Sequence, residues 1–449
     1  MARQRLLIAA GTVTLTVSVW GLLRLGSIGT GFTIALFGAL VLCLIPRPSL
    51  PALALAIWAL VPRRITVDLI GLDMIYPLMA IVMLWALRTL IGGRATMTPS
   101  KAGMWLSALI VCAVVWFCFV TLLTRAWGES LTWTGAFVLL LAVPALLSDA
   151  LTVRWLQRTM LVLAGLLAVF ALLEFALQRN PVYDPIYSAL GSADVQVWSV
   201  YRAHAAFGHP LYASLFFSAT AAFSLGRFLE TGRSRYILLA ALIGVATVVT
   251  VSRSGIVSAG VSIALLLLLA VFRAKHLSGL IKSALVLLAV GGFGLVMQFG
   301  AFAERSTSAE ASSSSTAREW VVELALEAAA DSSWLGSGPG TSADAVRALN
   351  GYQLLVENGY LQLLVSVGVV GLLLVIAVIA MIAVVALRRG RFAALGMLAA
   401  VSTSIAGFNG LESNPSMLIL FGAAAAFALA PGTSIPESRA IELRTVMAP

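Results

Sequence analysis

Residues 358–386 read NGYLQLLVSVGVVGLLLVIAVIAMIAVVA and contain no charged side chain. A helix needs roughly 20 apolar residues to cross the hydrocarbon core of a bilayer. The apolar residues of this run are continuous rather than alternating, which favours a helix over a strand of a membrane barrel. The stretch therefore predicts a membrane-spanning helix.

Comparable runs cover most of the chain, since 60% of its 449 residues are hydrophobic and only 11% are charged. Lipid cannot satisfy free backbone groups, so we predict an all-α polytopic membrane protein with about 12–14 transmembrane helices. The predicted spans are residues 6–23, 31–45, 50–62, 66–90, 103–124, 131–147, 159–177, 209–228, 236–251, 255–273, 280–299, 358–386, 392–410 and 416–430. The span at 50–62 is short, and a re-entrant segment is the open alternative there.

The distribution of basic residues predicts the orientation. With the N-terminus in the cytoplasm, 19 of the 29 Lys and Arg residues fall on the cytoplasmic side, all the lysines included. This positive-inside bias explains most of the net charge of +10, so no nucleic-acid partner is expected. The predicted segments are N-terminal transmembrane helices (1–200), central helices with outer arginine motifs (201–299), one large extracytoplasmic loop with short helices (300–357), C-terminal helices (358–430) and a cytoplasmic tail (431–449).

The large loop contains two patterns of its own. A Ser/Ala-rich stretch precedes a capping-box pattern at 316–319, which predicts a surface helix at 317–330. One face of this helix would carry Trp320, Leu324 and Ala328. The glycines that follow, Gly336, Gly338 and Gly340, predict a tight turn, and together with the Ser/Ala stretch they would let the loop close over a substrate.

Two arginines are candidates for chemistry because they lie at predicted outer ends of spans. Arg202 belongs to the cluster at 201–210, and Arg253 lies in the very short turn between two spans. Charge near the hydrocarbon boundary is costly and often functional, although snorkelling to lipid headgroups is the alternative. Arg318 lies in the first turn of the loop helix, where its charge opposes the helix dipole and suggests a phosphate partner.

Carboxylates and histidines complete the candidates. We expect Glu357, where the loop meets the next span, to be partly buried, which would suit it to act as a general base. His204 and His209 are the histidines on the outer side, and each is an acid, a base or a packed ring. Asp68, Asp73, Glu174 and Glu412 are expected to pair with outer arginines. The spacing of these residues matches no metal or nucleotide motif, so neither a metal nor a cofactor is expected.

Four motifs follow one another between residues 202 and 371 of the chain. They are Arg202 with Phe207-Gly208-His209-Pro210; Thr250-Val251-Ser252-Arg253-Ser254-Gly255; Arg318 and Trp320 with the turn at 335–340; and Glu357-Asn358-Gly359-Tyr360-Leu361 followed by Gly368 and Gly371. In this order, over about residues 200–412, they resemble the O-antigen ligase and polymerase superfamily. Ligases usually show histidine at the position of Glu357, which leaves a polymerase or another relative open.

The resemblance implies a membrane glycosyltransferase of the bacterial cytoplasmic membrane. It would use a polyprenyl-diphosphate-linked glycan, such as an undecaprenyl one, at the extracytoplasmic face. The acceptor would be a hydroxyl of a glycan or lipid, and transfer would be inverting and metal-independent. Catalytic roles would fall to Glu357, Arg253 and Arg202, and substrate-binding roles to Arg318, His204, His209, Asn358 and Tyr360.

Two other classes of function remain open. A transporter or flippase for a lipid-linked or small anionic substrate would use the same arginines to bind rather than to catalyse. Transporters often show two related halves, and this sequence shows no internal repeat. A scaffold protein is the second alternative, although it would not require arginines on three separate outer segments.

Overall fold

The computed structural model describes residues 42, 44–92, 101–191, 200–273, 278–298, 300, 309–350 and 355–430. Every regular element in these ranges is a helix, which confirms the all-α prediction. The elements are η1 (Arg47–Ser49), α2 (Leu50–Leu60), α3 (Arg63–Ile70), α4 (Ile75–Ile91), α5 (Lys101–Thr124), α6 (Trp127–Ala136), η2 (Phe137–Ala142), α7 (Val143–Leu147), α8 (Ala150–Leu177), α9 (Tyr183–Ala189), α10 (Pro210–Thr231), α11 (Ser234–Val249), α12 (Arg253–Arg273), α13 (Gly279–Met297), α15 (Ala309–Asp331), α16 (Ser342–Leu349), α17 (Gly359–Arg388), α18 (Phe392–Ile405), α19 (Gly410–Ser413), η3 (Pro415–Met417) and α20 (Leu418–Leu429).

Within the described residues, five helices are long and apolar enough to cross a membrane. They are Lys101–Thr124, Trp127–Leu147, Ala150–Leu177, Arg253–Arg273 and Gly359–Arg388. Shorter apolar helices of 10–17 residues accompany them. The chain is thus a multi-pass membrane protein, while the number of twelve to fourteen spans stays a prediction. The predicted span 6–23 and nearly all of 31–45 lie outside the described residues.

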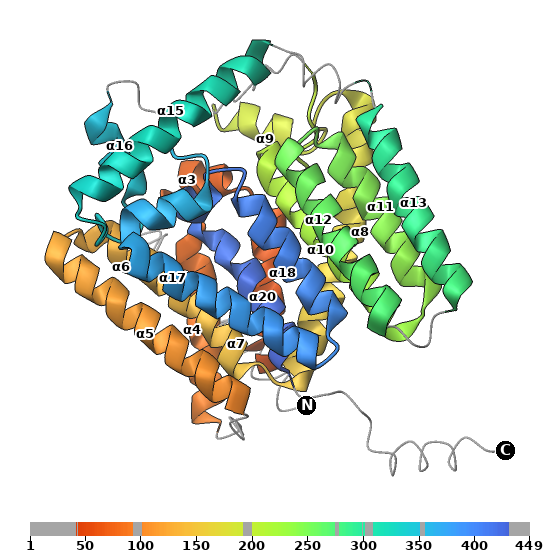
Figure 1. Cartoon of the computed structure of the whole chain (residues 1–449), viewed down its shortest axis with the longest axis horizontal. Helices are drawn as coiled ribbons and strands as arrows, with labels where there is room; N and C mark the ends of the chain where they lie inside the picture. Colours follow the sequence, from red (N-terminus) through yellow and green to blue (C-terminus); the bar gives the residue numbers. More distant parts are fainter. Residues whose placement is uncertain are drawn as a thin grey trace, which may run out of the picture.

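The centre of the bundle is α10, which packs against α11, α12 and α18 (Figure 1). Almost all its side chains are buried, including Ser214, Ser218 and Ser224. Small residues permit close helix approach in a membrane. A Cβ on Gly226 would lie 2.4 Å from the Cα of Ala393 on α18, so only glycine fits at this contact.

The predicted span 66–90 is wrong as a single helix, because the chain forms α3 and α4 instead. Gly71 ends α3 with a φ of 66°, in the left-handed region that favours glycine. Two ion pairs lie on this part of the chain, Arg63–Asp73 at 2.6 Å and Arg64–Asp68 at 3.5 Å. The predicted pairing of these two aspartates with neighbouring arginines is therefore confirmed.

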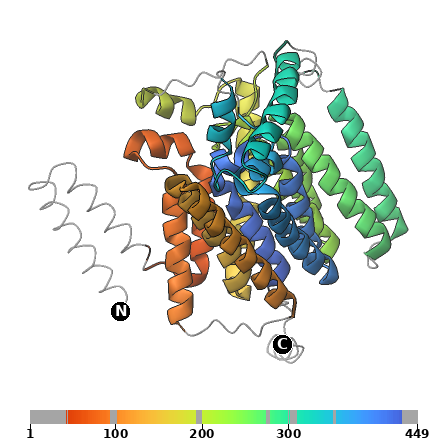
Figure 2. The ribbon, with the colours of Figure 1, turned by 60° about the vertical axis from the view of Figure 1, so that its left-hand side comes forward.

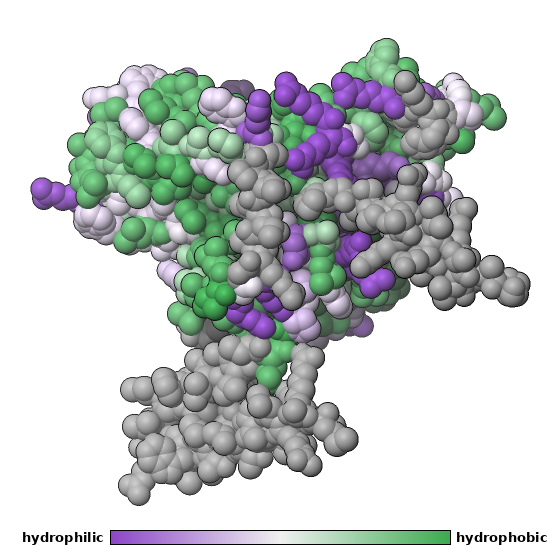
Figure 3. Space-filling view, turned by 90° about the horizontal axis from the view of Figure 1, so that it is seen from below, coloured by the Kyte–Doolittle hydropathy of each residue, from purple (hydrophilic) through white to green (hydrophobic). Residues whose placement is uncertain are grey.

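One end of the bundle, here called the loop face, carries α3, α9, α15 and α16 (Figures 1 and 2). The turns that join α10 to α11 and α17 to α18 lie at the other end, together with the end of α12 and the start of α13, and this end is rich in arginine (Figure 1). Hydrophilic residues gather there among apolar ones in the view from below (Figure 3). The basic residues of these turns and adjoining helix ends are Arg227, Arg233, Arg235, Arg273, Lys282, Arg388, Arg389 and Arg391.

Candidate active site

The segment that carries Arg202 docks on the turn that carries Arg253. The guanidinium Nε of Arg202 donates a hydrogen bond to the carbonyl of Thr250 (3.2 Å), and the backbone N–H of Ala203 donates to the carbonyl of Val249 (3.1 Å). Arg202 is only 6% exposed. The structure therefore places the segment of Arg202 against the residues that lead into Arg253, 51 positions along the sequence.

Serine and glycine contacts fix the helices that begin beside these arginines. Ser214 on α10 donates to the hydroxyl of Ser252 (3.0 Å), in the turn before α12. One helical turn into α12, Ser258 donates to the carbonyl of Ala400 on α18 (2.6 Å). A Cβ on Gly255 would lie 2.4 Å from that of Ser214. The position of Arg253 at the start of α12 is thus set by buried contacts on two sides.

Residues 405–411, which run from the last residue of α18 into α19, connect this turn to the start of α17. The Gly407 backbone packs on Ser254, where an added Cβ would lie 2.6 Å from the serine Cβ. A Cβ on Gly359 would lie 3.1 Å from the carbonyl oxygen of Ile405 and 3.3 Å from the Cβ of Leu411, at the two ends of the segment. The Arg253 turn and the helix start that follows Glu357 therefore flank one segment of the loop face.

Glu357 is exposed, so the prediction that it is partly buried is wrong. It lies just before the N-cap of α17, Asn358, whose side-chain oxygen accepts from the N–H groups of Tyr360 (2.9 Å) and Leu361 (3.2 Å). The hydroxyl of Tyr360 donates to the carbonyl of Ser402 on α18 (2.9 Å). Asn358 and Tyr360 thus have structural contacts, and their substrate-binding roles stay predictions.

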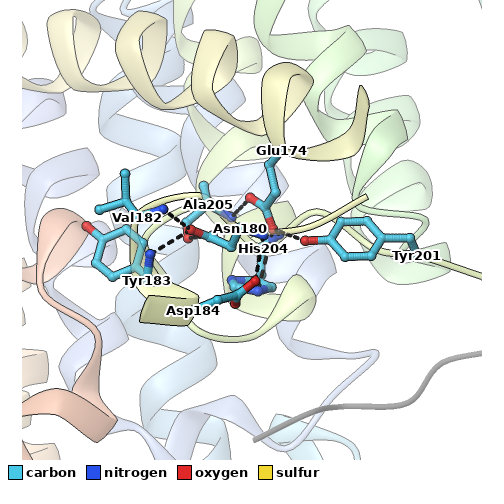
Figure 4. A network of polar contacts seen from close by, with 8 residues as sticks. All are labelled: Glu174, Asn180, Val182, Tyr183, Asp184, Tyr201, His204 and Ala205. Carbon is cyan, nitrogen blue, oxygen red and sulfur yellow. Dashed lines mark hydrogen bonds and ion pairs between the residues drawn. The ribbon is translucent and has the colours of Figure 1, made fainter. Parts of the chain in front are cut away.

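The two histidines differ in their surroundings. His209 is the N-cap of α10: its Nδ1 accepts from the N–H of Leu211 (3.2 Å), and its ring contacts Tyr212 with 5.7 Å between centroids. His204 faces Glu174 on α8, with Nε2 3.5 Å from the carboxylate (Figure 4). His209 is therefore a capping residue, whereas His204 belongs to a polar network around a buried acid.

The glycine-rich turn after α15 is anchored to a break in α17. Gly368 interrupts that helix with a φ of 69° and a ψ of −176°. The carbonyls of Val365 and Ser366 accept from the N–H groups of Ser337 and Gly338, both at 2.9 Å. These bonds satisfy backbone groups that the break would otherwise leave free. A third bond, from the N–H of Val369 to the carbonyl of Trp334 (3.1 Å), lies after the break. Closure of the loop over a substrate stays a prediction.

Glu412 holds the residue that follows this turn. Its carboxylate accepts from the N–H of Ser342 (3.0 Å) and from the Ser342 hydroxyl. Burial raises the pKa of Glu412 to about 7, and the Ser342 hydrogen bonds oppose that rise. The predicted pairing of Glu174 and Glu412 with outer arginines is wrong, because both carboxylates accept hydrogen bonds from loop segments instead.

Helix α15 confirms the predicted loop helix, although it begins earlier, at Ala309. Its buried residues include Val321, Ala325, Ala328 and Ala329, while Trp320 is 55% exposed. Arg318 lies on this helix, and its side chain is outside the described part of the structure. Among the described residues, no three His, Cys, Asp or Glu side chains gather as a metal site would require.

Sequence reasoning missed the role of Glu174 as the centre of a polar network. The carboxylate accepts from the N–H groups of His204 (3.0 Å) and Ala205 (2.7 Å) and from the hydroxyl of Tyr201 (3.0 Å). A lone acid near the end of an apolar run was the available signal, since such residues are costly in a membrane and are usually partnered.

Comparison with known families gives a match over residues 238–376, to the family described as O-antigen ligase. No curated protein sequence matches the chain. The matched range begins in α11 and ends in α17, and it includes Arg253, Arg318 and Glu357. It confirms the resemblance predicted from the motifs, and with it a membrane enzyme that transfers glycans. Over residues 238–376, the chain is therefore similar to the O-antigen ligase family.

Proposed function

We propose that this protein transfers a glycan from a polyprenyl-diphosphate carrier to an acceptor hydroxyl at the extracytoplasmic face of the bacterial cytoplasmic membrane. One observation carries the proposal: Arg202 donates to the carbonyl of Thr250, three residues before Arg253. Two arginines that share one site suit a diphosphate, since guanidinium groups bind phosphate oxygens in a bidentate manner.

The orientation is part of the proposal. The turns and helix ends opposite the loop face carry the group of basic residues named above, and the positive-inside rule assigns such an end to the cytoplasm. The loop face would then be extracytoplasmic. A donor that acts there must arrive already activated, as a lipid diphosphate is.

The proposed reaction is a single displacement at the anomeric carbon. The acceptor hydroxyl gives its proton to the carboxylate of Glu357, and its oxygen forms a bond to the anomeric carbon. The bond between that carbon and the diphosphate oxygen breaks, and its electron pair leaves with the polyprenyl diphosphate. Arg202 and Arg253 stabilise the developing negative charge, with Arg318 assisting. One displacement inverts the anomeric configuration, and no step requires a metal.

The remaining predicted site residues belong to the segments that carry Arg202 and Glu357 or to the helices that follow them. His204 adjoins Arg202, whereas Asn358 and Tyr360 follow Glu357 at the start of α17. His209 lies at the start of α10, and its ring packs on Tyr212, which in turn contacts Phe408 of the 405–411 segment at 5.8 Å. We propose that these residues bind the donor or acceptor glycan.

A transporter or flippase is the second candidate, and the broken helix α17 is the observation that favours it. Discontinuous helices form the substrate sites of many transporters, where free helix ends bind ions. In this protein, however, N–H groups of Ser337 and Gly338 already bond to the carbonyls of Val365 and Ser366. The break is filled by the protein's own backbone, which supports an enzyme over a transporter.

The proposal is tested by deleting the gene and complementing the strain with wild type or Arg253→Ala. Lipid-linked and surface glycans are then profiled by gel and mass spectrometry. A polymerase defect accumulates single lipid-linked repeat units, and a ligase defect accumulates long lipid-linked chains without surface attachment. An unchanged profile in the deletion strain contradicts the proposal and favours the transporter.

A further inference from the structure

Glu174 is an acid inside a membrane helix, and among the described residues the basic side chain that faces it is that of His204. It lies one turn before the C-terminal end of α8, and its side chain is 0% exposed. A buried carboxylate is costly unless hydrogen bonds satisfy its oxygens. The residues that donate these hydrogen bonds therefore indicate which segment the carboxylate of Glu174 holds in place.

In the described part of the chain, the hydrogen-bond and ion-pair partners of Glu174 come from residues 201–205 (Figure 4). Oε2 accepts from the N–H of Ala205, and Oε1 accepts from the N–H of His204 and from the hydroxyl of Tyr201. The imidazole of His204 lies 3.5 Å from the same oxygen. One carboxylate thus binds this short segment at three residues.

A second contact tightens the same segment. The side-chain amide of Asn180 donates to the carbonyl of Ala205 (2.9 Å). Ala205 has a φ of 49°, in a region that residues other than glycine rarely adopt. Such a conformation persists only where its surroundings impose it, and here Glu174 and Asn180 bind its N–H and its carbonyl.

Arg202 lies between two partners of the acid, Tyr201 and His204. Its own guanidinium reaches the carbonyl of Thr250, across the site from α8. The segment is therefore fixed by Glu174 on one side and by the α11–α12 turn on the other. Because Arg202 lies within it, the direction of the guanidinium depends on the hydrogen bonds of the acid.

We infer that Glu174 is the positioning residue of the donor site: it fixes residues 201–205 so that Arg202 and Arg253 present one preformed site to a diphosphate. This inference rests on the proposed function. It assigns Glu174 no contact with the substrate. Its effect is to hold a charged group in place before the donor arrives, which is how preorganised sites avoid reorganisation during the reaction.

The test is a double-mutant cycle on the purified full-length protein. The variants are Glu174→Gln, Arg202→Ala and the combination of both. Glutamine is chosen because it replaces one accepting oxygen of Glu174 by an NH2 donor that faces backbone N–H groups. The matched control is Glu230→Gln, since Glu230 also accepts a backbone hydrogen bond, from Ala393 (2.9 Å), at the opposite end of α10. Two quantities are measured: glycan transfer, with separate KM values for donor and acceptor, and inhibition by polyprenyl diphosphate.

We expect Glu174→Gln to weaken inhibition by polyprenyl diphosphate and to raise the donor KM, with a loss of transfer of about 100-fold, as small misplacements of catalytic groups cause. The acceptor KM should stay within about twofold, which a general folding defect would not produce. In the Arg202→Ala background, Glu174→Gln should add little further loss, since residues that act through one another are not additive.

Three outcomes decide the matter. If Glu174→Gln causes the same fold-loss with and without Arg202, or if it behaves like Glu230→Gln, the inference is overturned although the proposed function stands. If wild type neither transfers glycan nor binds polyprenyl diphosphate, the proposed function fails, and the inference fails with it. If Glu174→Gln does not fold, Tyr201→Phe takes its place, since it removes a single hydrogen bond to Glu174. The smaller loss of transfer that Tyr201→Phe causes must then vanish in the Arg202→Ala background, or the inference is overturned.

Discussion

Replacement of Gly368 by alanine would test how the large loop is anchored in the membrane domain. The glycine has a φ of 69° and a ψ of −176°, and an added Cβ would lie 2.3 Å from the carbonyl oxygen of Trp334. A residue with a Cβ pays a conformational cost of about 1–3 kcal/mol in such a region. The clash would also separate the turn from α17.

That separation would break three backbone hydrogen bonds. They join Ser337 to Val365, Gly338 to Ser366 and Val369 to Trp334, at 2.9, 2.9 and 3.1 Å. Each contributes about 0.5–1.5 kcal/mol net. With the strain included, we expect Gly368→Ala to lower the free energy of unfolding by roughly 3–7 kcal/mol.

The matched control is Gly390→Ala. Gly390 also has a positive φ, of 65°, but an added Cβ would meet no atom within 4 Å. This variant should therefore show only the left-handed strain, about 1–2 kcal/mol. The assay is thermal unfolding in detergent, combined with limited proteolysis of residues 331–342. A Gly368→Ala protein as stable and as resistant to protease as Gly390→Ala would refute the anchoring.

Three further predictions concern the site. Arg253→Lys keeps the charge but loses the bidentate guanidinium, so we expect a transfer rate at least about 100-fold lower with an unchanged Tm, and near wild-type transfer would remove bidentate binding from the mechanism. Glu357→Gln should abolish transfer while the affinity for polyprenyl diphosphate is kept, and an active variant would assign proton removal to another group such as His204. Burial raises the pKa of Glu412 from 4.5 to about 7, so its contribution to stability is fully present below about pH 4.5 and is lost as the pH rises through about 7. The Tm of wild type should therefore fall between these two pH values, and the Tm of Glu412→Gln should fall less. If Tm falls equally with pH in the two proteins, the raised pKa of Glu412 is contradicted.

The sequence predicted the helices well where one apolar run stood alone. The run at 358–386 appears as α17, because nearly every residue in it favours burial in lipid or protein. It failed at 66–90, where the left-handed conformation of Gly71 ends α3 between Asp68 and Asp73, because a glycine alone does not show whether a helix ends or continues. The same limit hid the break at Gly368, since a glycine in an apolar run is also common in an unbroken helix.

The candidate site was predicted in part. Arg202 and Arg253 were chosen because charge is costly near a membrane, and the structure places their segments in contact. The role of Glu174 could not be predicted, because its partners lie about 30 residues away across a connection with no periodic pattern. Glu357 was expected to be partly buried because it adjoins a span, but its side chain lies on the exposed side of the capped helix start.

The central claim is that this protein transfers a glycan from a lipid diphosphate through Arg202 and Arg253. The most direct test incubates purified wild type and Arg253→Ala with a polyprenyl-diphosphate-linked glycan and an acceptor, without added metal. The released polyprenyl diphosphate and the anomeric configuration of the product are then measured. We expect wild type to release carrier and product in equal amounts with inverted configuration, and Arg253→Ala to release neither. Retained configuration, or equal release by the variant, would contradict the account.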